Sequence, residues 1–579
     1  MTRAFSRRQF LAAALASPAA AAYTRSGSGQ RRTSNPPGGQ RRVAAAPPAS
    51  PDPRLWLPAT HGEGAGVAFT NAPDWLRDTP GWYVPSTVSA GACMLQFPEV
   101  TFLSTLIRSF RELPSLLDQA KSLGTSTIYI VDWFEGQPGA RPINYWTNKG
   151  DYIPRADLGG DAALQAGIAA VHAAGGRIVL YVEGFIVIRD TRAGVAHGAQ
   201  WSIVWPAGPQ PYPEAWKPCP GAEGWLAYVE DVARRIGGYG ADGIFLDSQG
   251  FQKDWKCLSR EHGHPPGDPD VFNNGCANLI RRVRSGLRQG NPDGIVFIEG
   301  PTLVRLFEQA DGSMEWGIDT LVRRWLWDDQ GKTDTLTSSY SLDDWNQVLA
   351  IGAKLACGSQ FLKAPPEASA QAFLETFLSK ALPDKPVDLQ HVAQHASWGL
   401  HAWRNGGLIR GVRVPGLDDF LPRNWEQMEH LTGAFAALHS TRDKLRAALE
   451  AQRPRAAAID QALAGQAAPS PVAYVKALLS ARAALAPIID HGSTVESVRT
   501  PFVKAAGWRF SSSRGTALTA VNVADDARDV AFTNAAGAWQ DEVAGETFTA
   551  QGGTLTVPVP AHRVRLLRSA QARGRADTR

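Results

Sequence analysis

The chain of 579 residues is poor in cysteine and has no long uninterrupted apolar run. None of its five cysteines forms a Cys-x-x-Cys pair, so a zinc knuckle or a thioredoxin-type site is not expected. No segment of about 20 apolar residues is free of polar breaks, so no membrane-spanning helix is predicted. No Gly-x-Gly-x-x-Gly motif opens a predicted helix, which leaves an open doubly wound sheet, the alternative fold, without its usual nucleotide-binding signature.

Acidic residues are absent from residues 1–51, which contain eight arginines. Residues 1–22 combine Arg7 and Arg8 with a following Ala-rich run, a pattern that resembles a Tat-type signal peptide and predicts export to the periplasm or the extracellular space. Residues 23–51 are rich in Gly, Ser, Pro and Ala and are predicted to be a disordered linker. Because the whole chain has a formal charge of +4, residues 52–579 carry −4, and nucleic acid is not an expected partner.

Export to an oxidising compartment would permit disulfides. Cys219 and Cys257 lie on predicted loops on either side of one strand and are the pair best placed for a bridge; free thiols are the alternative, because Tat substrates often fold before export. The segment His262-Gly263-His264 lies in a polar loop beside two prolines and is interpreted as a turn. The sequence therefore predicts no metal site and no cofactor.

Residues 96–423 alternate helical periodicity with short apolar runs, a rhythm typical of a parallel sheet covered by helices. The clearest strands are 127–131, 177–182, 243–246 and 294–298. They are apolar throughout and rich in β-branched and aromatic residues, as expected of strands buried on both faces. Long segments follow these strands, as in a (β/α)8 barrel, where such loops build the active site.

Flanking segments complete the predicted organisation of the chain. Residues 52–95 are predicted as a β-rich N-terminal segment, and residues 424–493 as a helical region. Residues 494–570 show period-two patterning and are predicted as a C-terminal antiparallel β-sandwich. Residues 571–579 are predicted as a disordered tail. The predicted fold class is therefore α/β: a (β/α)8 TIM barrel followed by a helical region and a β-sandwich. The sequence does not indicate the oligomeric state.

Each of the four clear strands is followed or ended by a carboxylate: Asp132, Glu183, Asp247 and Glu299. In a parallel barrel all four strand ends face the same mouth. Such a concentration of like charge raises pKa values and costs stability unless a function uses it. Hydrolysis of a glycosidic bond needs two carboxylates, whereas metal-dependent barrel hydrolases usually place His-x-His on a strand, and no predicted strand contains that pair.

Tryptophan is abundant, with 19 residues, and many fall in the loops predicted at the barrel mouth, Trp133 and Trp327 among them. An aromatic ring can stack on the apolar face of a pyranose while polar groups fix the hydroxyls. The tryptophans therefore favour a carbohydrate as the substrate.

The segment from Tyr239 to Gly250 resembles the nucleophile strand of retaining α-glycosidases, namely the α-galactosidase-like clan and the endo-α-N-acetylgalactosaminidases. Residues 171–181 are similar to their helix-to-strand passage one unit earlier, and residues 297–301 lie where they carry the next strand-end acid. The resemblance covers roughly residues 100–400 and implies a retaining glycoside hydrolase with Asp247 as the nucleophile.

In the endo-acting relatives the acid/base is a Glu on the next strand, which matches Glu299. In the α-galactosidase-like members it is a later Asp, for which Asp328 is the alternative here.

Under this interpretation, Asp132 and Glu183 would bind sugar hydroxyls, and Trp133 would line the pocket together with Trp327. Arg324 would hold a carboxylate ionised or recognise an acidic sugar. The expected substrate is an oligo- or polysaccharide. A noncatalytic carbohydrate-binding barrel and a metal-dependent hydrolase of non-glycosidic bonds are the alternatives.

Overall fold

The structure is a computed structural model, and most of the chain between residues 73 and 570 can be described. The described residues are 73–85, 103, 106–135, 148–206, 215–249, 255–268, 271–299, 309–315, 336–337, 342–358, 371, 374–375, 378, 441–464, 471–491, 493–498, 500–502 and 504–570. The predicted signal peptide, linker and C-terminal tail lie outside these residues.

Eight parallel strands close into a barrel, in the order β1-β12-β11-β10-β9-β8-β5-β2. They are β1 (Gly81–Val84), β2 (Thr127–Ile130), β5 (Arg177–Glu183), β8 (Gly243–Asp247), β9 (Ile295–Glu299), β10 (Gly312–Glu315), β11 (Leu336–Thr337) and β12 (Lys354–Gly358). Every residue of β8 and β9 is buried, as their apolar sequences predict. The predicted barrel is confirmed, and its first strand lies upstream of residue 96, within residues 52–95, the predicted β-rich N-terminal segment.

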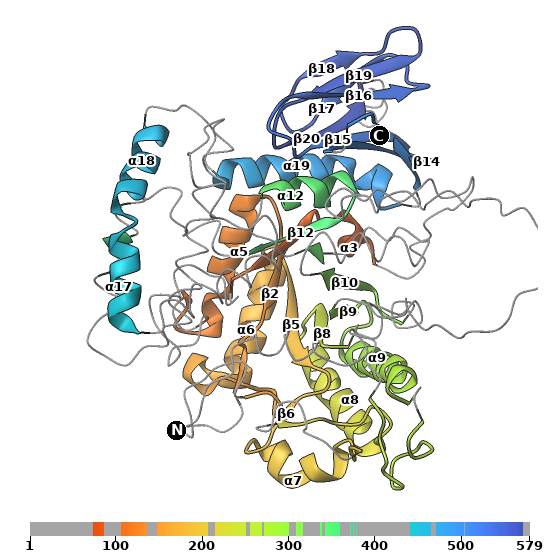
Figure 1. The fold of residues 1–579 in the computed structure, drawn as a ribbon. Coiled ribbons are helices and arrows are strands. Elements are labelled where there is room, and N and C mark those ends of the chain that lie inside the picture. Colours follow the sequence, from red (N-terminus) through yellow and green to blue (C-terminus); the bar gives the residue numbers. More distant parts are fainter. Residues whose placement is uncertain are drawn as a thin grey trace, which may run out of the picture.

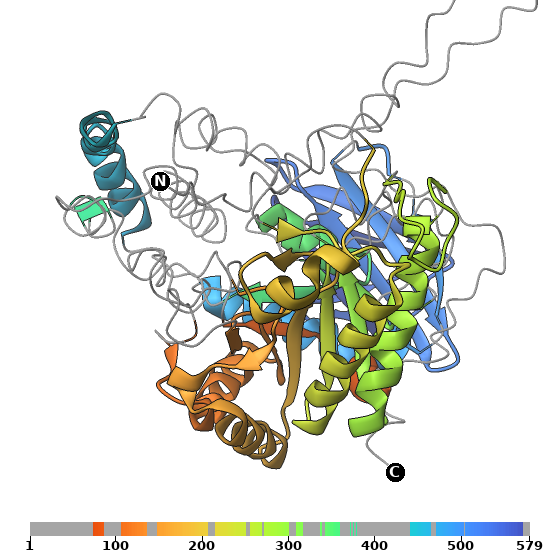
Figure 2. The same cartoon turned by 90° about the horizontal axis from the view of Figure 1, so that it is seen from below.

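Helices lie outside the strands and cover the barrel (Figures 1 and 2). The main ones are α5 (Leu113–Leu123), α6 (Gly160–Ala173), α8 (Glu223–Gly238), α9 (Val271–Gly290) and α12 (Leu342–Ala350), with the shorter α3 (Asp74–Asp78), η3 (Phe110–Glu112) and η4 (Ala156–Leu158). Loops at the carboxyl ends of the strands add two small hairpins, β3 (Phe134–Glu135) with β4 (Ile153–Pro154) and β6 (Val187–Ile188) with β7 (Ala215–Trp216), and the helix α7 (Arg192–Trp201).

The C-terminal part is an antiparallel β-sandwich (blue in Figure 1). One sheet contains β13 (Thr494–Val498), β14 (Ala505–Ser512), β15 (Gly515–Asn522), β20 (Arg563–Ser569), β17 (Ala538–Asp541) and β18 (Thr547–Thr549), and the other pairs β16 (Arg528–Thr533) with β19 (Thr554–Val559). Alternate residues of both sheets, such as Leu518, Phe532 and Leu555, form their shared core. The helical region before it includes α17 (Arg442–Glu450), α18 (Arg453–Leu463) and α19 (Pro471–Ile489).

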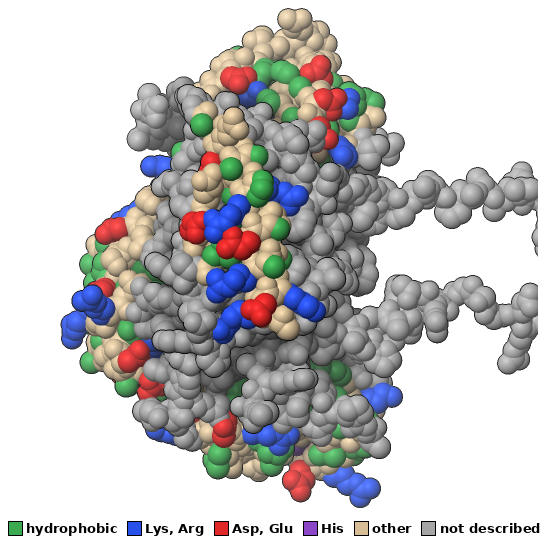
Figure 3. All heavy atoms as spheres, turned by 60° about the vertical axis from the view of Figure 1, so that its left-hand side comes forward, with side chains coloured by type: hydrophobic (Ala, Val, Ile, Leu, Met, Phe, Trp, Pro, Cys, Tyr) green, Lys and Arg blue, Asp and Glu red, His purple; other side chains and the backbone are tan. Residues whose placement is uncertain are grey.

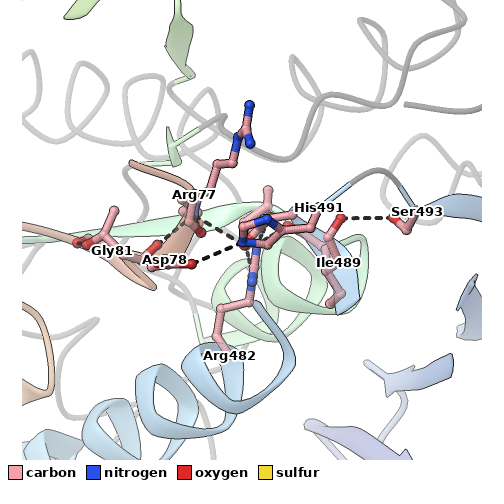
Figure 4. Close-up of polar contacts among 12 residues, drawn as sticks. Arg77, Asp78, Gly81, Arg482, Ile489, His491 and Ser493 are labelled. Atoms are coloured by element: carbon pink, nitrogen blue, oxygen red, sulfur yellow. Dashed lines mark hydrogen bonds and ion pairs between the residues drawn. The ribbon is translucent and has the colours of Figure 1, made fainter. Parts of the chain in front are cut away.

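Helix α19 lies between the sandwich and the barrel (Figure 1), where a buried polar junction joins it to two barrel strands (Figure 4). Lys354 Nζ, at the start of β12, donates to the carbonyls of Arg77 and Thr79, which precede β1, at 2.8 and 2.6 Å. Asp490 lies 3.3 Å from Lys354 and 2.6 Å from Arg482. Because these contacts are made where β1 and β12 begin, the sandwich and α19 lie at the amino end of the barrel, opposite the mouth.

The face of the molecule in Figure 3 carries Lys and Arg side chains interspersed with Asp and Glu, and the described atoms show no single-sign stripe across it. Among the described helices, none combines the length and the hydropathy that a membrane crossing requires.

Candidate active site

Three of the four strand-end acids lie side by side at the barrel mouth. Glu183 of β5 is paired in register with Asp247 of β8. Leu246 of β8 is paired with Ile298 of β9, so Glu299 ends the next strand at the neighbouring position. Asp247 retains 8% of its surface, whereas Glu183 and Glu299 are buried at 0% and 2%. Asp247 is therefore the acid of this group that solvent, or a substrate, reaches most directly.

Lys149 and Tyr181 hold the carboxylate of Asp247. The Tyr181 hydroxyl donates to Asp247 Oδ2 at 2.5 Å, and Lys149 Nζ lies 3.6 Å from the same oxygen. Lys149 also forms an ion pair of 2.5 Å with Glu183 Oε2, to which Tyr181 donates at 3.2 Å. One ammonium group thus contacts two carboxylates, and it is itself almost fully buried.

Burial dominates the electrostatics of Glu183. Burial raises the pKa of its carboxyl, Lys149 lowers that pKa, and the negative charge of Asp247 raises it again, with a net increase. Glu183 is fixed from the main-chain side as well, because its backbone N–H donates to the Tyr152 hydroxyl at 2.8 Å. Burial and the charge of Glu183 raise the pKa of Tyr152 well above its ordinary value, so its phenol remains protonated at neutral pH.

Glu299 is tied to the residue that follows Asp247. The backbone N–H of Ser248 donates to Glu299 Oε2 at 3.1 Å. Ser248 has a φ of 65° and Tyr152 a φ of 49°, so two residues that contact strand-end acids adopt the left-handed backbone that non-glycine residues disfavour. Such backbone strain costs on the order of 1–3 kcal/mol per residue and is concentrated at functional sites. The backbone strain therefore marks this part of the barrel mouth as a functional candidate.

Asp132 and Trp133 are buried and contact protein groups. Asp132 is 1% exposed and accepts hydrogen bonds from Arg155 Nη1 at 3.3 Å and from the backbone N–H of Leu103 at 2.7 Å. Its predicted role in binding hydroxyls stays a prediction. Trp133 has no exposed surface, and its Nε1 donates to the carbonyl of Tyr181 at 2.9 Å. The predicted role of Trp133 in lining the pocket stays a prediction; in this structure the indole is buried and contacts the backbone of Tyr181.

Arg324, Trp327 and Asp328 lie outside the described residues, so their predicted roles are untested. Sequence reasoning did not single out Lys149 or Tyr181. Tyr181 could have been found, because it lies two residues before Glu183 on one strand and residues spaced by two share a face. Lys149 gave no such signal, because it reaches the site from a loop between β3 and β4.

A second group of chemically active side chains lies in the loops after β5 and β8. Cys219 and Cys257, predicted to be either bridged or free, are both free thiols in the structure. His262 and His264, interpreted as part of a turn, lie beside them: the four ligand atoms of this set are all within 4.8 Å of one another.

Comparisons with known proteins give one family model and distant similarities to solved structures. A family model described as "Domain of unknown function (DUF6259)" matches residues 60–301, which is less than half of the chain. No curated protein matches the sequence.

Three solved structures illustrate what the chain is similar to in shape. An alpha-amylase from Geobacillus thermoleovorans, solved with acarbose, has a TM-score of 0.44 and 11% identity, over 86% of this chain and 99% of that one. A maltogenic alpha-amylase from Thermotoga neapolitana has a TM-score of 0.45 and 9% identity, over 85% and 99%. A debranching enzyme from Nostoc punctiforme has a TM-score of 0.46 and 11% identity, over 86% and 100%. Similarities this distant do not decide the function of this chain.

Proposed function

We propose that the chain is a retaining glycoside hydrolase that acts on an oligo- or polysaccharide, with Asp247 as the nucleophile and Glu299 as the acid/base. The observation that carries the proposal is the carboxylate of Asp247, the most exposed of three neighbouring strand-end acids, held by Lys149 and Tyr181. Active sites of parallel barrels are built at this end of the strands.

The chemistry needs one carboxylate that attacks and one carboxyl group that donates a proton. In the first step an Asp247 oxygen bonds to the anomeric carbon, the bond from that carbon to the leaving oxygen breaks, and Glu299 donates its proton to that oxygen. In the second step water attacks the anomeric carbon and transfers a proton to Glu299, and the bond to Asp247 breaks. The sum is hydrolysis with retention of configuration.

The charges of the site support this chemistry. Glu183 and Asp247 both contact the ammonium group of Lys149. The ionised carboxylate of Asp247 favours the oxocarbenium-like transition state, which gains positive charge at the sugar ring. Lys149 and Tyr181 position the nucleophile through Oδ2 and keep it oriented before substrate arrives.

The test begins with wild-type protein and a panel of aryl glycosides, and NMR of the first product reports retention or inversion. A 2-deoxy-2-fluoro glycosyl fluoride should label the Asp247 peptide. D247A should have no detectable turnover, and azide should restore it as a glycosyl azide of inverted configuration. An inverted hydrolysis product or a label on another residue would exclude the proposed mechanism.

Two further variants assign the acid/base. E299A should lose on the order of 10²–10⁴-fold in rate on substrates with poor leaving groups, and much less on activated aryl glycosides. D328A is the matched comparison, because Asp328 is the alternative donor; the same pattern in D328A alone would transfer the role to it. If wild-type protein binds glycans but hydrolyses none of the panel, the noncatalytic carbohydrate-binding barrel is the better explanation.

Export by a Tat-type signal belongs to the same proposal, because residues 1–22 combine Arg7 and Arg8 with a following Ala-rich run. Fractionation of the native host and N-terminal sequencing of the mature protein test it. We expect the mature chain in the periplasm or medium, starting near residue 23.

A further inference from the structure

We infer that Cys219, Cys257, His262 and His264 form a zinc site that joins two loops on the mouth side of the barrel. Cys219 lies on the loop between β5 and α8, and the other three residues lie on the loop between β8 and α9. Two thiols and two imidazoles are a common ligand set of structural zinc, which binds four protein ligands in a tetrahedron. The inference does not depend on the proposed glycosidase activity.

The distances between the ligand atoms fit a tetrahedral ion. Cys219 Sγ lies 3.3 Å from His264 Nε2, and Cys257 Sγ lies 3.4 Å from His262 Nδ1. Zn–S bonds of about 2.3 Å and Zn–N bonds of about 2.0–2.1 Å place a sulfur and a nitrogen ligand about 3.6 Å apart in a tetrahedron. Both sulfur–nitrogen distances are close to this value, and all four ligand atoms lie within 4.8 Å of one another.

The histidine tautomers also fit, because each ring has its second nitrogen committed to a carbonyl. His262 Nε2 lies 3.0 Å from the carbonyl of Gln200, and His264 Nδ1 lies 2.9 Å from the carbonyl of Pro265. A carbonyl only accepts, so these two nitrogens carry the protons. The lone pairs of His262 Nδ1 and His264 Nε2 are then directed at the cluster, and such second contacts are typical of metal-bound histidines.

Both sulfur atoms accept a hydrogen bond from the backbone. The backbone N–H of Gly221 donates to Cys219 Sγ at 3.4 Å, and that of Val204 donates to Cys257 Sγ at 3.4 Å. Donors of this kind stabilise a thiolate, the form that binds a metal. Gly221 also makes room for the His264 ring, since a Cβ at residue 221 would lie 2.5 Å from His264 Cδ2.

Both cysteines are buried and all four ligands come from protein, so the site has no open position for a substrate. The ion would have a structural role, because it would cross-link the loops that follow Glu183 and Asp247. An aromatic cluster already connects the same loops, with the rings of Phe185 and Trp255 at 5.3 Å between centroids.

The decisive measurement is the metal content of full-length protein purified under reducing conditions without chelator. We expect about one zinc ion per chain by mass spectrometry. Replacement by Co²⁺ should give the intense visible absorption and the sulfur-to-cobalt charge-transfer band of a tetrahedral thiolate site. Removing the ion with a strong chelator should lower the midpoint of thermal unfolding, and added zinc should restore it.

The variants C219A and H264A should each lose the ion, whereas C357A is a matched control that should retain it. Cys357 is also a buried free cysteine, but it lies on β12 away from the cluster. Should C219A fail to fold, the cobalt spectrum of the wild-type protein still decides the question. Wild-type protein that binds neither zinc nor cobalt, a Cys219–Cys257 disulfide detected by differential alkylation of native protein, or a C219A variant with full metal content would each overturn the inference.

Discussion

Lys149 controls the balance of charge in the acid cluster, because its ammonium contacts both Glu183 and Asp247. All three side chains are nearly or fully buried, so water screens these interactions only weakly. Lys149 also lies 5.4 Å from the centre of the Tyr181 ring, whose hydroxyl contacts the same two carboxylates. Lys149 therefore lowers the pKa of Glu183 and favours the ionised form of the two carboxylates that it contacts.

The variant K149M should move the acidic limb of the kcat/KM profile to higher pH. Burial already raises the pKa of Glu183, and Lys149 opposes that increase, so its removal raises the pKa further. Glu183 is then protonated at a higher pH than in the wild type. Asp247 loses the same ammonium group, so we expect its ionised, nucleophilic form only at higher pH. An opposite charge at this distance shifts a carboxyl pKa by about 1–3 units, so we expect a displacement on the order of one pH unit.

The control for this prediction is K149R, which keeps the charge and should leave the acidic limb near its wild-type position. Both variants should first be shown to be folded by circular dichroism, because removing one partner of a buried ion pair is destabilising. An unchanged pH profile in folded K149M would show that Lys149 does not influence the group that titrates.

The positions of some candidate site residues could be predicted, because the sequence pattern around them identifies a strand end. Asp247 and Glu299 each end an apolar run, so the end of the run identifies them. His262 and Cys219 were not predictable as partners, because more than forty positions separate them and no Cys-x-x-Cys spacing connects them. Only the folded loops bring these ligands together.

At the scale of elements, the contact between α8 and α9 depends on glycines that let the two backbones approach. A Cβ at residue 237, in α8, would lie 2.3 Å from the carbonyl oxygen of Leu287 in α9. The neighbouring Gly238 is exposed and has no atom within 4 Å of a Cβ built there. Two adjacent glycines of one helix therefore provide a matched pair.

We expect G237A to lower the free energy of unfolding by about 1–3 kcal/mol, because α9 must move to admit the methyl group. G238A should be neutral or slightly stabilising, since alanine is a better helix former than glycine by up to about 1 kcal/mol. Urea denaturation of the two variants beside the wild-type protein measures both values. Equal stability of the two variants would contradict close backbone packing of α8 against α9.

Long apolar strands were predictable and short ones were not. The runs that became β2, β5, β8 and β9 are buried on both faces and therefore nearly uniform in hydrophobicity. β12 begins with Lys354, a residue that argues against a buried strand, and its ammonium group contacts Asp490 and two carbonyls from before β1. β11 has two residues, too few for any periodicity to appear.

At the scale of the whole molecule, the described strands of the sandwich contact α12 and α19, on the side of the barrel where β1 and β12 begin. The Thr519 hydroxyl of β15 donates to the carbonyl of Ala350, at the end of α12, at 2.6 Å. Asn346 of α12 donates to the carbonyl of His562, which precedes β20, at 2.9 Å. The sequence could predict the sandwich from its alternating pattern, but no pattern within a strand indicates which end of the barrel it covers.

His562 makes this junction sensitive to pH. Its Nδ1 lies 2.8 Å from Asp343 of α12, and its Nε2 lies 3.1 Å from Asp525 of the sandwich. Burial lowers the pKa of His562, but the hydrogen bonds and charges of the two carboxylates raise it more, so the net shift is upward from 6.5. Only the protonated imidazolium can donate to both carboxylates at once.

A histidine with a raised pKa in the folded state contributes stability that is complete below its unfolded value of 6.5 and is lost as pH rises through the folded value. We therefore expect the free energy of unfolding to fall as pH increases above 6.5, by about 1.4 kcal/mol for each unit of the shift.

H562N is the informative variant: asparagine tolerates the φ of 53° at this position but does not titrate there. Urea unfolding of both proteins between about pH 6 and pH 9 should show this decline in the wild type and its absence in H562N. If the free energies of unfolding of the two proteins change in parallel with pH, His562 does not couple barrel and sandwich. If they converge at high pH, the imidazolium stabilises the contact between this end of the barrel and the sandwich.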